Sequence, residues 1–143
     1  MNEDTISLLK ECNSGCKMAT NSIEQVLPYI ENDKLKSMIV SYNDKHIKIG
    51  DKCHQMLNKS QEEEQDPHTM AKVFSWISTE MKLVLNNDTP KIADLLIDGC
   101  NMGIKSVNSY INKYNSASEE SKNLAKRLVE MEQKFMNELL EYL

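Results

Sequence analysis

The chain has 143 residues, a net charge of −5 and 40% hydrophobic residues, which suits one folded domain with a continuous core. The acidic balance argues against nucleic acid and anionic membranes as partners, because both favour a basic surface. The first residues lack the basic and apolar regions of a secretion signal, and no apolar run approaches the roughly 20 residues of a membrane span. We therefore expect a cytoplasmic protein. Its four cysteines are expected to be reduced and buried: Cys12, Cys16, Cys53 and Cys100.

The first part of the chain, about 4–59, reads as a helical hairpin. Apolar residues recur there at alternating steps of three and four, the signature of one helical face. Pro28 is expected to end the first helix, and Asn32 or Asp33 can cap the second. The first stripe is Leu9, Cys12, Cys16, Ala19, Ile23, Val26 and Ile30, and the second is Leu35, Ile39, Tyr42, His46, Ile49, Cys53 and Met56.

The next part, about 60–89, reads as a crossover that contains one shorter helix. A polar stretch runs to Asp66-Pro67, a pair typical of a helix start. The apolar face of this short helix is Met70, Phe74, Ile77, Met81 and Val84. The segment is long enough to run the length of a bundle.

The last part, about 90–143, reads as a second helical hairpin. Ser116-Ala-Ser-Glu119 has the pattern of a capping box that starts its second helix. Breaks of about two residues are expected within each hairpin. The sequence thus predicts a single all-α domain over 1–143, an antiparallel four-helix bundle of two hairpins with a shorter fifth helix in the crossover.

A short string occurs in both hairpins. Cys12-Asn-Ser-Gly15-Cys-Lys17 matches Cys100-Asn-Met-Gly103-Ile-Lys105 at four of six positions. One interpretation is an ancestral duplication of the hairpin. The alternative is that the two glycines only permit close helix packing.

These features resemble the ferritin-like superfamily, in its rubrerythrin-related branch, and within it a bacterial family of short ferritin-like domains of unknown function. The resemblance rests on the Leu8–Ala19 segment, on Phe74-Ser-Trp76, and on Gly103 followed by Tyr110. It implies a ferritin-like bundle. Metal-bearing members place a carboxylate on one helix of each hairpin and a Glu-x-x-His pair on the other.

That ligand pattern is broken here. One pair reads Asn43-x-x-His46 and the other reads Glu132-x-x-Phe135, so about two of the six ligands implied by the resemblance remain. Cys16, expected at the level of His46, could complete a mixed site for a single zinc or iron with His46 and Glu132. The alternative is that His46 is a hydrogen-bonded core residue.

No nucleophile with a base, phosphate-binding loop or paired carboxylate can be placed in the sequence. The favoured interpretation is a bundle without catalytic residues that acts through assembly as a homodimer or through another protein partner. The alternative is a metal-binding or redox protein of the ferritin-like class with an altered site. No cofactor is assigned beyond the candidate zinc or iron.

Overall fold

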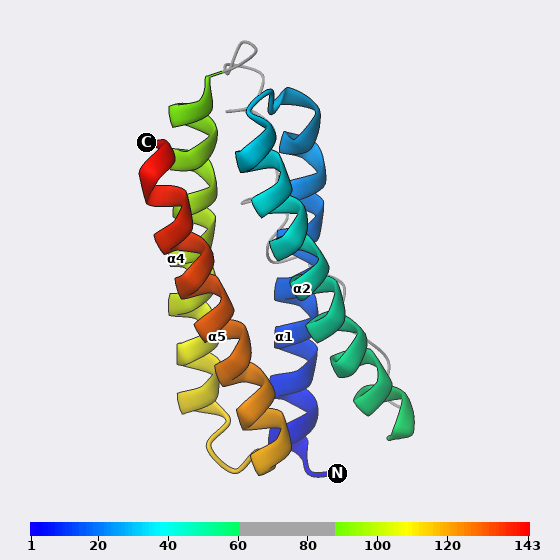
Figure 1. The fold of residues 1–143 in the computed structure, drawn as a ribbon. Helices are drawn as coiled ribbons and strands as arrows, with labels where there is room; N and C mark the ends of the chain where they lie inside the picture. The colour runs from blue at the N-terminus through cyan, green and yellow to red at the C-terminus, as the bar shows by residue number, and fades with distance from the viewer. Residues whose placement is uncertain (61–87) are drawn as a thin grey trace.

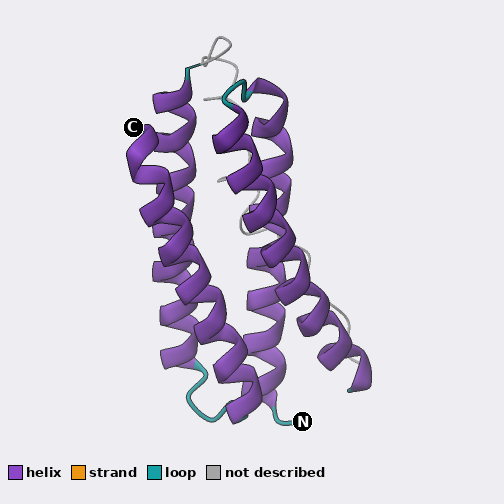
Figure 2. Cartoon of the chain, in the orientation of Figure 1, coloured by secondary structure: helices purple, strands orange, loops and turns teal. Residues whose placement is uncertain are grey.

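The computed structural model describes residues 1–60 and 88–143. These residues form four long α-helices and two short 3-10 helices, and no strand is found among them. The all-α prediction is therefore confirmed (Figure 2). The fifth helix and the crossover were predicted for residues that include 61–87, which lie outside the described part of the chain. Within the described residues, no helix is both long and apolar enough to span a membrane.

The first hairpin consists of α1 (Glu3–Val26) and α2 (Asp33–Lys59), joined through the 3-10 helix η1 (Leu27–Tyr29). Pro28 lies in η1, directly after α1, as its missing N–H predicts. The cap of α2 is Asn32, whose side-chain oxygen accepts from the Leu35 N–H at 2.9 Å. The connection is longer than the two residues expected, because η1 adds one turn before the cap.

The second hairpin consists of α4 (Thr89–Lys113) and α5 (Glu119–Leu139), followed by η3 (Leu140–Tyr142). Asp88 caps α4. The prediction of a capping box that begins at Ser116 is wrong. The N-cap of α5 is Ser118, whose hydroxyl accepts from the Ser121 N–H at 3.2 Å. Ser116 instead bonds to α1, because Asp4 accepts its backbone N–H at 2.9 Å.

The two hairpins point in opposite directions, so α1 and α5 run one way and α2 and α4 the other (Figure 1). The start of α1 lies beside the α4–α5 loop, and two more hydrogen bonds join them. Asn2 donates to the Ser116 carbonyl at 2.8 Å, and the Ser118 N–H donates to Thr5 Oγ1 at 2.8 Å. These bonds fix the register of the second hairpin against the first.

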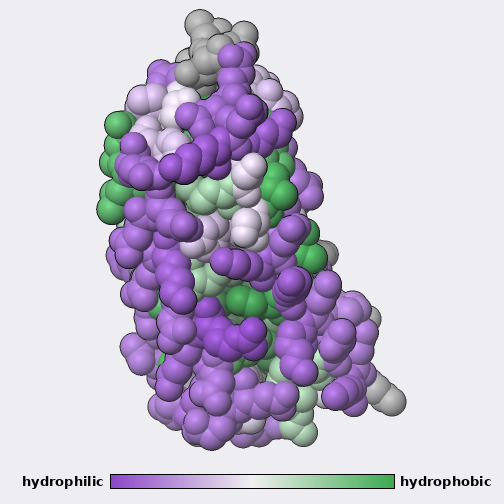
Figure 3. Space-filling model, in the orientation of Figure 1, coloured by the Kyte–Doolittle hydropathy of each residue, from purple (hydrophilic) through white to green (hydrophobic). Residues whose placement is uncertain are grey.

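The core lies along the bundle axis. Helix α1 contacts α2, α4 and α5, and α2 also contacts α5. All seven residues of the predicted α2 stripe, from Leu35 to Met56, are buried. Polar residues cover most of the face seen in Figure 3, with apolar residues showing between them. The helical periodicity read from the sequence therefore identifies the core, and it places one polar residue, His46, at its centre.

Candidate functional site

His46 lies in the middle of α2 and is 1% exposed. Its Nδ1 lies 2.7 Å from the carbonyl oxygen of Tyr42, one turn earlier in the same helix. A carbonyl oxygen only accepts hydrogen bonds, so Nδ1 carries a proton and donates it. This bond fixes the ring and aims Nε2 away from α2, towards α5.

Glu132 reaches that nitrogen from α5, and its Oε1 contacts His46 Nε2. Because Nδ1 already carries a proton, the contact needs exactly one proton between Nε2 and the carboxyl group. The pair is therefore either an imidazolium with a carboxylate or a neutral imidazole with a carboxylic acid. Both states have no net charge, which suits a site where Glu132 is only 6% exposed.

Glu132 also contacts α4, the other helix of its own hairpin. The Cys100 thiol forms a hydrogen bond with it. A Cβ placed on Gly103 would lie 3.5 Å from Glu132 Oε2. The glycine therefore leaves room for the carboxyl group beside α4, and the pair ties α2 to both helices of the other hairpin.

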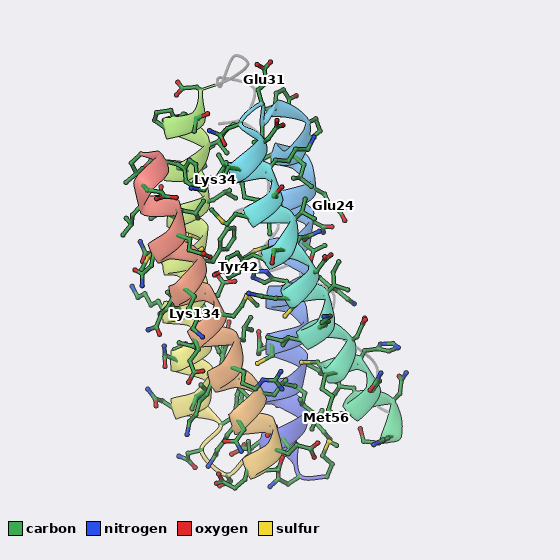
Figure 4. The ribbon with its side chains drawn as sticks, in the orientation of Figure 1. Glu24, Glu31, Lys34, Tyr42, Met56 and Lys134 are labelled. Carbon is green, nitrogen blue, oxygen red and sulfur yellow. The ribbon has the colours of Figure 1, made fainter. Side chains whose placement is uncertain are left out.

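Asn43 and Phe135 stand where the resemblance implies two further ligands. Phe135 is buried and stacks on Tyr42 with ring centroids 4.6 Å apart, and its ring meets the His46 ring edge-on at 6.2 Å. Tyr42 points from α2 towards α5 in the middle of the bundle (Figure 4). Asn43 is buried, and its Oδ1 has no hydrogen-bond partner among the described residues. An aromatic stack thus fills much of the space beside the pair.

Two of the three candidate metal ligands lie in contact, since His46 Nε2 meets Glu132 Oε1. Cys16 is also buried, and it lies close enough to Glu132 for the carboxylate to affect its thiol. Among residues 1–60 and 88–143, however, no group of three or more His, Cys, Asp or Glu side chains has a geometry that could hold a metal ion. His46 has also used both ring nitrogens, so a metal would have to displace a hydrogen bond.

The cysteines are all buried thiols, as expected. Burial raises the pKa of Cys53 to about 12. Burial, followed by the neighbouring Cys53, raises the pKa of Cys12 and of Cys16 well above the usual range. Burial and the Glu132 carboxylate do the same for Cys100. At neutral pH these groups are thiols and not thiolates, so they are poor nucleophiles and poor metal ligands.

Two hollows, each lined partly by α1, reach His46. The first is an open groove between α1 and α2, with a volume of about 490 Å³. It is lined by Asn13, Cys16, Lys17, Thr20, Asn21, His46, Ile47, Gly50, Asp51 and His54. At its floor, Asn13 is 2% exposed, and its Nδ2 has no hydrogen-bond partner within the described residues.

The second hollow is a small apolar cavity of about 70 Å³ between α1 and α4. His46, Glu132 and Phe135 form part of its wall. Gly15 also lines it, and a Cβ placed there would meet nothing within 4 Å. The prediction of close helix packing at Gly15 is therefore wrong. At Gly103, the atoms nearest to an added Cβ belong to the Glu132 side chain.

The groove between α1 and α2 is not predicted by the sequence. Asn13 and Lys17 stand in the repeated string, and their spacing of four places them on one face of α1. Asp51 and His54 lie on the solvent side of α2 and carry no pattern of their own. Comparisons with protein-family models, with curated proteins and with solved structures found no match to this chain.

Proposed function

We propose that this chain is a binding protein without catalytic residues, and that it recognises a protein partner in the groove between α1 and α2. We further propose a ferritin-like arrangement in which the His46–Glu132 pair takes the place of the metal centre. The two oppositely directed hairpins and the repeated Cys-Asn-x-Gly-x-Lys string support that arrangement. Bacterial origin and cytoplasmic location stay predictions from the sequence.

The observation that carries the binding role is the amide of Asn13. A buried donor without a partner costs about 1–3 kcal/mol, and buried polar groups are normally paired. This donor lies at the floor of a groove whose volume, about 490 Å³, is in the usual range for binding sites. The cost is offset when an occupant of the groove brings an acceptor.

The rim of the groove favours a protein over a small molecule. Ile47 lines the groove and is 40% exposed, and Val40 is 41% exposed. The two residues are seven apart in α2 and so share one face of the helix. Exposed apolar side chains rimmed by polar groups are typical of protein interfaces.

The geometry of the His46–Glu132 pair favours a binding role over a catalytic one. Both nitrogens of His46 are engaged, the thiols are protonated, and Glu132 is paired with His46 and Cys100. These contacts join α2, α4 and α5. These groups present no nucleophile, and His46 lines the groove.

The test is site-specific photo-cross-linking in cells that naturally make this chain. A photoreactive amino acid replaces Ile47, and the matched control carries it at Lys134, an exposed position on the outer side of α5 (Figure 4). We expect one discrete adduct from position 47, none from position 134, and loss of the adduct when Thr20→Trp fills the groove. The purified partner should then bind the wild-type chain at least tenfold more tightly than the Thr20→Trp chain.

Other outcomes contradict the proposal. Adducts only with a second copy of the chain would make the groove a self-association site. Adducts only within the chain, including with residues 61–87, would mean that no partner occupies it. Equal adducts from positions 47 and 134 would show non-specific contact.

A further inference from the structure

Helix α1 is buried even on the side that faces away from the core. Cys12 and Cys16 belong to the core, and Ser14 stands two residues from each of them. Since each residue turns the helix by about 100°, Ser14 points to the opposite side of α1. Its side chain is nevertheless only 2% exposed. A serine on the outer side of a bundle helix normally lies in solvent, so a further part of the protein covers this side.

The covered surface extends along α1. Met18, two residues after Cys16, is 7% exposed. None of residues 4–20 is exposed, whereas α2, α4 and α5 each present exposed residues in every turn. The outer side of α1 is thus an interaction surface that is already occupied.

The apolar hollow between α1 and α4 adjoins this surface. Ser14 and Met18 line the hollow from α1, and Gly99 and Gly103 line it from α4. A glycine carries no side chain that could reach over α1. A Cβ added at Gly15 or Gly99 would meet nothing within 4 Å, so the hollow has room for an apolar side chain that enters from outside.

Residues 61–87 connect opposite ends of the bundle. Helix α2 ends at the end of the bundle where α1 begins, and α4 begins at the far end (Figure 1). Helix α4 has 25 residues and is therefore about 37 Å long. Residues 61–87 would span about 40 Å as a helix and more where the chain is extended, so they are long enough to follow the bundle from end to end.

The connection from α2 to α4 can pass over α1 or over α5. The outer side of α5 carries Lys126, Glu130 and Lys134, a row of exposed charged residues spaced by four. Such a row is stable in water and offers an apolar segment nothing to pack on. The outer side of α1 is instead covered within the single chain, so its burial does not need a second copy or another protein.

We propose that residues 61–87 dock along the outer side of α1 and place apolar side chains in the hollow between α1 and α4. The helix face that the sequence predicts for this segment suits that surface, because docking removes the face from water. The face consists of Met70, Phe74, Ile77, Met81 and Val84. This contact goes beyond the proposed function and does not depend on it, because the partner groove lies on the α2 side of α1.

Photo-cross-linking within the purified full chain tests the contact. A diazirine analogue of methionine, close in shape to the native side chain, replaces Met18. The matched control carries it at Met131, which is also 7% exposed but belongs to α5. Mass spectrometry of the digested chain locates the adducts. Adducts with residues 61–87 should be about fivefold more abundant from position 18 than from position 131, because the activated group inserts only into atoms that it contacts.

Two aspartate variants test whether the apolar face makes the contact. Ile77 and Ser75 are two residues apart and so lie on opposite sides of the predicted helix. Ile77→Asp should reduce the adduct from position 18 about fivefold, since a charge is costly to bury in an apolar hollow. Ser75→Asp adds the same charge and should leave the adduct unchanged. Circular dichroism checks the helix content of both variants.

Adducts from position 18 that fall only on α1, α2, α4 or α5 would overturn the proposal. So would adducts that join two chains, which a mixture of isotope-labelled and unlabelled protein identifies. Equal adducts with residues 61–87 from positions 18 and 131, or equal losses in the two aspartate variants, would also overturn it. If Ile77→Asp fails to fold, the comparison of positions 18 and 131 in the otherwise native chain decides.

Discussion

Replacing Glu132 of the buried His46–Glu132 pair should lower the free energy of unfolding by an amount that depends on the new side chain. Glutamine keeps nearly the same shape and can serve both neighbours. Its NH₂ group donates to His46 Nε2, which accepts once Nδ1 holds the proton, and its oxygen accepts from the Cys100 thiol. Glu132→Gln should therefore lower the free energy of unfolding by about 1 kcal/mol or less.

Glu132→Met removes both hydrogen bonds at nearly constant volume. It leaves Nε2 of a residue that is 1% exposed without a partner, so the expected loss is about 2–4 kcal/mol. For a domain of this size the Tm should fall by roughly 6–15 °C. Pairing it with His46→Leu removes the orphaned group too, and the double variant should recover most of the loss.

Urea and thermal unfolding, followed by circular dichroism at neutral pH, measure this series. An equal loss of unfolding free energy in Glu132→Gln and Glu132→Met would contradict this prediction, because the hydrogen bonds to Glu132 would then contribute nothing. The prediction is also refuted if the double variant is no more stable than Glu132→Met. The matched volumes mean that a cavity cannot explain either difference.

Three further predictions follow from the same contacts. Gly99→Ala should raise the free energy of unfolding by about 0.5–1 kcal/mol, since the added Cβ meets nothing within 4 Å. Gly50→Ala should give no such gain, because its Cβ would press on the Cys16 Cβ. Equal gains of the two variants in urea unfolding would contradict this. Folding raises the pKa of all four thiols. Their contribution to the free energy of unfolding is therefore complete below about pH 8.5, and it falls by about 1.4 kcal/mol per thiol for each pH unit above that value. For Cys53 the loss continues to about pH 12, and Cys53→Ala should reduce the slope by about a quarter; an unchanged slope in alkaline unfolding would refute it. Equimolar zinc at neutral pH should shift the Tm by less than about 1 °C, because binding must break a hydrogen bond of His46; a larger shift that His46→Leu removes would favour the alternative metal site.

The sequence predicts much of this fold because helix periodicity and caps are local. The α2 stripe is buried as read, and Asn32 caps α2. The contact between His46 and Glu132 could be anticipated by counting turns from each hairpin connection. The start of α5 could not, since Ser116 and Ser118 are equally good caps and the choice depends on a bond from Ser116 to Asp4 of another helix.

The groove shows where sequence reasoning stops. Asn13 is a polar residue beside an apolar stripe, and nothing in its neighbours along the chain says whether its amide is paired. That depends on Gly50, 37 positions later, which approaches Asn13 only after the hairpin forms. Residue spacing within one helix therefore does not predict a groove that forms between two helices.

The central claim is that the groove between α1 and α2 is where this chain meets its partner. The most direct measurement is NMR shift mapping of the full chain with the purified partner captured at position 47. The largest shifts are expected on Asn13, Lys17, Thr20 and Gly50, and Thr20→Trp should abolish them. Shifts centred on α4 and α5, with none at Asn13, would contradict it.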